Sequence, residues 1–125
     1  MYLGIEQETR IMDIQKAFNA AYPYLKLEFF RNPSPQNKIS QKLEKISPGI
    51  SVKNITHFYN PGSIHIDDKR TVEELVNDFW EYFGLSVLVF RRSGNLWIET
   101  SLTDSWTLDR QNKIGESFST QTDNI

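Results

Sequence analysis

Apolar residues in the first quarter of the chain predict a strand, a helix and a second strand. Residues 2–5 alternate between apolar and polar, which is typical of a half-buried strand. Apolar side chains then recur at the helical period over residues 11–22. Pro23 ends this helix because its ring clashes with the preceding turn, and residues 24–31 alternate again as a second strand.

The same order of elements recurs 61 positions further along the chain. Residues 63–66, 72–83 and 85–92 repeat the strand, the helix and the strand, and Gly84 is suited to the left-handed conformation that ends a helix. With a constant offset, the second strands of the two units align residue by residue. The side chains predicted to face the helices are then Leu27, Phe29, Leu88 and Phe90.

Two strand–helix–strand units predict an α+β fold with a ferredoxin-like βαββαβ core on a mostly antiparallel sheet. Residues 32–62 form an insert, in which a helix carrying Ile39, Leu43 and Ile46 precedes a strand within residues 50–59. An extra hairpin and a helix ending at Gly115 follow the second unit. The alternative is a ubiquitin-like roll, in which a hairpin at residues 50–66 leads into the main helix.

Length and composition predict one cytoplasmic domain. The 125 residues suffice for a single core, which we place at residues 1–115, and the polar composition of residues 116–125 predicts a disordered tail. The chain has no cysteine, which excludes disulfides and thiolate chemistry. It begins without a basic and apolar leader, and no apolar run approaches the ~20 residues that a membrane span needs.

The predicted sheet carries apolar and aromatic side chains on the face that the two main helices do not cover. Such a face is typical of a partner site, so a non-catalytic protein-interaction or self-association domain is the leading functional hypothesis. Arg91 and Arg92 would border this surface. In the alternative, the insert helix or the C-terminal helix covers the face. The residues predicted to contact the partner are Tyr24, Phe30, Val87, Val89 and Trp97.

Two histidines and an aspartate suggest a second hypothesis, a metal-binding protein or metal-dependent enzyme. A three-residue loop at 60–62 would place His57 opposite His65 in a hairpin, with Asp67 on the same side. The register is an assumption, because a slip of one residue separates the side chains. Two solvated histidines near a turn are the alternative interpretation.

Other classes of function have less support in the sequence. Aromatic side chains on an open sheet are found in RNA-recognition modules, but their glycine-aromatic motif with basic residues is missing here. A net charge of −2 also argues against a nucleic-acid partner. No glycine-rich phosphate loop and no G-x-S-x-G motif occurs, so we expect no cofactor and no catalysis.

Three segments resemble a small family of uncharacterised bacterial proteins. They are Tyr22-Pro-Tyr-Leu-Lys-Leu-Glu-Phe-Phe30, residues 83–100 with the motif Phe-Gly-Leu-x-Val-x-Val-Phe-Arg, and residues 103–112 with Thr-Asp-x-Trp-Thr-Leu. The resemblance implies a cytoplasmic bacterial protein. It implies no activity and no site residues.

Overall fold

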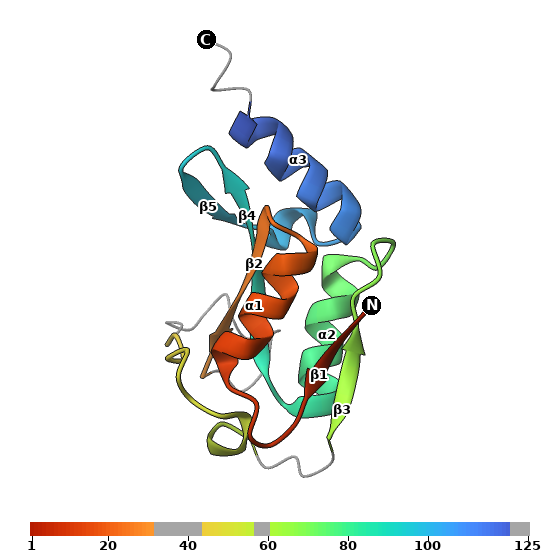
Figure 1. Cartoon of the computed structure of the whole chain (residues 1–125). Coiled ribbons are helices and arrows are strands. Elements are labelled where there is room, and N and C mark those ends of the chain that lie inside the picture. The colour runs from red at the N-terminus through yellow and green to blue at the C-terminus, as the bar shows by residue number, and fades with distance from the viewer. Residues whose placement is uncertain (32–43, 57–60, 121–125) are drawn as a thin grey trace.

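The computed structural model describes residues 1–31, 44–56 and 61–120, and their arrangement is shown in Figure 1. The α+β class is confirmed, with three helices among the described residues. In chain order the elements are β1 (Tyr2–Ile5), α1 (Ile11–Ala21), β2 (Leu25–Phe30), the 3-10 turn η2 (Val52–Asn54), β3 (Gly62–His65), α2 (Val72–Phe83), β4 (Ser86–Ser93), β5 (Leu96–Glu99), the 3-10 turn η3 (Ser101–Thr103) and α3 (Leu108–Thr120).

The strands form two separate antiparallel sheets. β1 pairs with β3, and β4 lies between β2 and β5 in a three-stranded sheet. This differs from the ferredoxin-like prediction, in which both strands of a unit return to one sheet. The reason is that α1 and α2 each contact strands of both sheets, so every strand–helix–strand unit crosses from one sheet to the other. In Figure 1 the three-stranded sheet lies behind these two helices, and β1 and β3 lie in front.

The registers of the two sheets relate the two units by an approximate two-fold axis. Leu3 pairs with Ile64 in the first sheet, and these positions are 61 apart. Glu28 pairs with Leu88 in the second sheet, and these positions are 60 apart. In each sheet, a strand of one unit therefore pairs antiparallel with the corresponding strand of the other unit. The two-fold axis passes through the pair of equivalent residues at the centre of each ladder.

The second strands of the two units are offset by 60 residues and not by 61. The faces predicted for β4 were therefore wrong. Leu25 is the first buried strand residue of unit one and follows Tyr22 by three positions, whereas Leu85 follows Phe83 by two. Gly84 shortens this link because it turns the chain at once, with a φ of 63°. A slip of one residue moves every side chain to the other face, so Val87 and Val89 face the helices.

The core lies between the sheets and the helices. Phe18, Phe29 and Phe79 are fully buried, and the rings of Phe29 and Phe79 meet edge to face with centroids 5.4 Å apart. Tyr22 ties α1 to the chain after β3, since its hydroxyl donates to the Ile66 carbonyl at 2.6 Å. None of the helices within the described ranges is long and apolar enough to cross a membrane.

The C-terminal helix is longer than predicted. α3 continues to Thr120, so residues 116–120 are helical, while residues 121–125 lie outside the described residues. Gly115 does not end the helix and has no positive φ. It allows close packing instead, because a Cβ there would lie 2.9 Å from the Tyr24 Cβ and 3.0 Å from the Arg91 Cγ.

The insert also differs from its prediction where it is described. The predicted helix positions Ile39 and Leu43 lie outside the described residues. Ile46 lies in extended chain, where its N–H donates to the Phe29 carbonyl at 2.8 Å. The predicted strand at 50–59 is replaced, over its described part, by the 3-10 turn η2.

Candidate interaction surface

Three of the predicted partner residues are buried and cannot form an exposed surface. Val87 and Val89 are each only 1% exposed, on the side of the sheet that faces α1 and α2, and Phe30 is 7% exposed. For the two valines the reason is the shorter link after α2. On the other face of β4, Leu88 is also buried, at 7% exposed.

Two further predicted residues are held by α3. The Tyr24 N–H donates to the Asn112 Oδ1 at 2.9 Å, and the Arg91 guanidinium donates to the Gln111 Oε1 at the same distance. The Arg91 side chain also lies 5.7 Å from the Trp106 ring. Burial lowers the pKa of Arg91 from its ordinary value. The C-terminal helix therefore covers this part of the sheet, as the alternative interpretation proposed.

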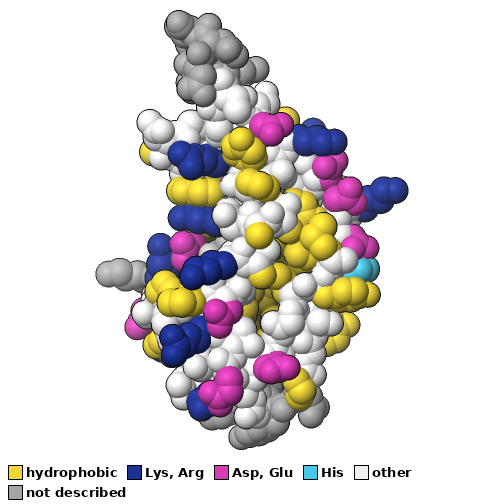
Figure 2. Space-filling view, in the orientation of Figure 1, with side chains coloured by type: hydrophobic (Ala, Val, Ile, Leu, Met, Phe, Trp, Pro, Cys, Tyr) yellow, Lys and Arg dark blue, Asp and Glu magenta, His cyan; other side chains and the backbone are white. Residues whose placement is uncertain are grey.

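The remaining predicted residues, Trp97 and Arg92, lie together on the opposite face of the sheet. They are cross-strand partners, and the Arg92 Cζ is 5.8 Å from the centre of the Trp97 ring. Lys26 approaches the same ring, with its Nζ at 4.8 Å. A cation close to a tryptophan ring is attracted to its electron-rich face. On the side where Figure 1 places β2 and β5, Figure 2 shows basic and hydrophobic side chains alternating down the molecule.

The free edge of β2 is closed by hydrogen bonds from its own chain. On α1, the Gln15 Nε2 donates to the Leu27 carbonyl at 2.9 Å, and the Asn19 Nδ2 donates to the Leu25 carbonyl at 2.8 Å. The next outward carbonyl, that of Phe29, accepts from Ile46. Covering a sheet edge in this way prevents another strand from pairing there.

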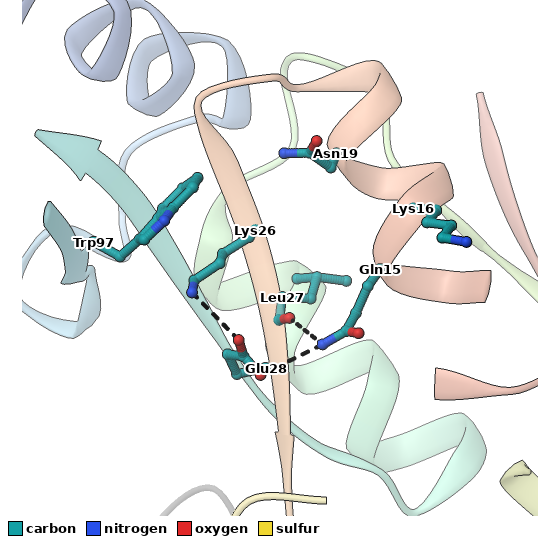
Figure 3. Close-up of a pocket in the computed structure, with 7 residues that line it drawn as sticks. All are labelled: Gln15, Lys16, Asn19, Lys26, Leu27, Glu28 and Trp97. Atoms are coloured by element: carbon teal, nitrogen blue, oxygen red, sulfur yellow. Dashed lines mark hydrogen bonds and ion pairs between the residues drawn. The ribbon is translucent and has the colours of Figure 1, made fainter. Parts of the chain in front are cut away.

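The hollow beside this edge is shallow and already occupied by polar contacts. It has a volume of about 320 Å³ and lies among Gln15, Lys16, Asn19, Lys26, Leu27, Glu28 and Trp97 (Figure 3). Glu28 accepts from Gln15 at 3.4 Å and pairs with Lys26 at 3.4 Å and with Lys45 at 3.6 Å. Because these groups satisfy one another, the hollow offers a ligand few free partners.

The other edge of the three-stranded sheet, that of β5, is open. Thr100 N–H donates to the Val89 carbonyl, so the alternation of the ladder directs the backbone groups of Trp97 and Glu99 away from β4. Within the described part of the chain, these backbone groups have no hydrogen-bond partner. β5 has no proline and no lysine, the residues that commonly protect an edge strand.

Exposed apolar side chains gather on and after this open strand. Leu96 is 69% exposed and Ile98 is 43% exposed, and both project from the face opposite Trp97. Leu102 follows in η3 and is fully exposed. A strand with an open edge and large apolar side chains favours pairing with another strand.

The histidine and aspartate of the metal hypothesis have other partners. His65 Nε2 lies 3.0 Å from Asp67 Oδ2, and the His65 ring stacks on Tyr2, its cross-strand neighbour in β1. Asp67 Oδ1 also accepts from the N-terminal ammonium at 3.3 Å. His57 lies outside the described residues, and among those described no three His, Cys, Asp or Glu side chains are grouped as metal ligands.

The sequence contains a signal for the closed edge outside its recognisable motifs. Gln15 and Asn19 are four residues apart, which places both amides on one side of α1, and that side faces the strand after the helix. For the open edge, the signal is the tight turn at Gly94, after which a short strand runs back along the preceding one. No further strand is predicted beside it, so its outer edge has no partner in the pattern.

No protein-family model, curated protein or solved structure matches this chain. The resemblance to a family of uncharacterised bacterial proteins stays a prediction.

Proposed function

We propose that the protein is a non-catalytic binding domain that takes up a strand of another polypeptide at the edge of β5. The observation that carries this proposal is the difference between the two edges of one sheet. The edge of β2 is closed by Gln15, Asn19 and the main chain of Ile46, whereas the backbone groups of Trp97 and Glu99 are open among the described residues.

An added strand would be recognised by both its backbone and its side chains. Its N–H and C=O groups would pair with those of Trp97 and Glu99, as in other complexes formed by strand addition. Alternate side chains would cover Leu96 and Ile98 on one face, where the exposed fractions are 69% and 43%, and Trp97 on the other. Burial of apolar surface then adds to the hydrogen bonds in stabilising the complex.

The outer face of the sheet favours a polypeptide over a nucleic acid. Bases bind to sheets by stacking on free aromatic rings. Here Lys26 already approaches the Trp97 ring at 4.8 Å and the Phe90 ring at 5.7 Å. Glu28 and Glu99 lie on the same face and would repel phosphates.

Photo-crosslinking from the two edges tests the proposal. A photoreactive amino acid replaces Leu96 beside the open edge or, as the matched control, the exposed Lys16 on α1 beside the closed edge. In cells that make the protein, the Leu96 variant should give an adduct of one discrete mass, and Ile98→Lys should remove it. The proposal fails if position 96 gives no adduct, or if both positions give the same adducts.

A further inference from the structure

We propose that the strand bound at β5 is β5 of a second copy of this chain, which makes the protein a two-fold symmetric dimer. This inference rests on the proposed function, since it names the occupant of the same edge. A two-fold contact requires a surface that is complementary to itself. The open edge meets this requirement in its backbone, its charges and its apolar side chains.

The backbone sets one register for antiparallel pairing of two β5 strands. Only Trp97 and Glu99 direct their N–H and C=O groups outward. If Trp97 of each copy pairs with Glu99 of the other, all of these groups are satisfied. Ile98 then lies on the two-fold axis, opposite Ile98 of the second copy. A shift by two residues would pair Glu99 with Asn95, which belongs to the turn, and would leave part of the edge open.

The charges on the outer face agree with this register. Trp97 is flanked by Lys26 and Arg92, whose cationic groups lie 4.8 Å and 5.8 Å from its ring centre. Pairing would place the Glu99 carboxylate of the second copy beside this tryptophan, on the side away from β4, where the long Arg92 side chain can reach it; Lys26 is already paired with Glu28. Among the described residues Arg92 forms no ion pair, and Glu99 accepts only from the Ser101 hydroxyl. Opposite charges placed in this way fix the register of an interface.

The apolar side chains agree as well. Directly opposite residues that do not exchange hydrogen bonds are the closest pair in an antiparallel ladder. Ile98 of each copy would form such a pair at the axis, with Leu96 on the same face beside it. Their exposed surface would be covered by the same residues of the second copy.

The closed edge of β2 ends the growth of this sheet at two copies. After β5 pairs with β5, the six-stranded sheet has a β2 strand at each end, and both ends are covered by Gln15, Asn19 and Ile46. Neither end of this six-stranded sheet then offers an edge to a third copy. Because β5 has only four residues, the interface is small and the dimer should dissociate on dilution.

Sedimentation over a wide range of concentrations, with complementary charges at position 98, tests this inference. The unsubstituted protein should change reversibly from monomer to dimer. Ile98→Lys and Ile98→Glu should each be monomeric, because like charges then meet at the axis, and an equal mixture of the two should dimerise. Ile98 is 43% exposed, so both variants should keep the fold, which circular dichroism checks. As the control, Lys16→Glu on α1 should dimerise like the unsubstituted protein.

Three outcomes would overturn the dimer. These are an unsubstituted protein that stays monomeric at all concentrations, a variant at position 98 that still dimerises alone, and a mixture that stays monomeric. The crosslinking result separates this failure from failure of the proposed function. An adduct of twice the chain mass from position 96 supports the dimer. A discrete adduct of another mass supports strand addition at β5 and contradicts the second copy as its occupant.

Discussion

Replacing Gly115 with alanine should destabilise the protein, although this change usually stabilises a helix. In an exposed helix interior, alanine is favoured over glycine by up to about 1 kcal/mol. At position 115 the new Cβ would lie 2.9 Å from the Tyr24 Cβ, 3.0 Å from the Arg91 Cγ and 3.2 Å from the Tyr24 carbonyl oxygen. Overpacking of this kind costs about 1–3 kcal/mol. The Tyr24 atoms belong to the chain that enters β2 and cannot move freely, so we expect a net loss of about 1–2 kcal/mol.

Urea unfolding of Gly115→Ala and of a control in the same turn measures this effect. Glu116→Ala changes an exposed side chain of α3 and should alter the free energy of unfolding by less than about 0.5 kcal/mol. For a domain of this size, the expected loss at position 115 corresponds to a Tm lower by roughly 4–8 °C. If Gly115→Ala is instead more stable than the unsubstituted protein, α3 does not pack on β4 at this distance and the reasoning is refuted.

Three other predictions test the core, a buried hydroxyl and the closed edge. Val87→Asp buries an unpaired carboxylate at a 1% exposed position and should unfold the protein, with a loss above about 4 kcal/mol; a folded variant by circular dichroism would contradict the assigned face of β4. Burial and the nearby carboxylates of Asp68 and Asp67 raise the pKa of Tyr22 to about 12. This pKa is raised above its unfolded value, so the neutral hydroxyl adds about 2–3 kcal/mol to the free energy of unfolding below pH ~10. This stabilisation is lost as the pH rises towards 12. Urea unfolding at several pH values should show this loss, and Tyr22→Phe should lack it; an equal loss in both would assign it to another group. The double substitution of Gln15 and Asn19 with leucine removes the amides that close β2 and should produce assemblies larger than a dimer, whereas an unchanged sedimentation profile would show that these amides do not block pairing.

α1 and α2 were predictable from sequence because each has one apolar face, but the faces of β4 were not. Leu85, Val87 and Val89 alternate with Leu88 and Phe90, so both sets of positions in this strand are mainly apolar. A strand with apolar side chains on both faces gives no period-two signal to choose between them. Only the length of the link after α2 decides the face. That length depends on the left-handed conformation of Gly84, which the constant offset of 61 did not take into account.

The separation into two sheets was also beyond the reach of the sequence pattern. β1 and β3 have four residues each, and their alternation predicts a strand without indicating which strand it pairs with. Their pairing is decided by the helices, which contact both sheets and so keep the two strands of each unit apart. For the candidate surface, the sequence predicted Trp97 and Arg92 as part of a broad sheet face. The surface we propose is a strand edge, and an edge depends on which strands are neighbours.

The two-fold relation between the units explains why the open edge of the sheet lies at β5. The two units present equivalent outer edges on β2 and β4, and each edge must satisfy its backbone groups. In the first unit, Gln15 and Asn19 of α1 do this for β2. The corresponding positions of α2 are Val76 and Trp80, and valine has no donor to offer.

The hairpin that adds β5 takes over this role in the second unit. Thr100, directly after β5, donates both its N–H and its hydroxyl to the Val89 carbonyl at 3.2 Å and 2.8 Å. Closing the edge of β4 with a strand creates a new edge, however, whereas closing an edge with side-chain amides does not. Among the described residues nothing covers that new edge. The difference between two amides on α1 and a hairpin after β4 therefore leaves the three-stranded sheet with one closed edge and one open edge.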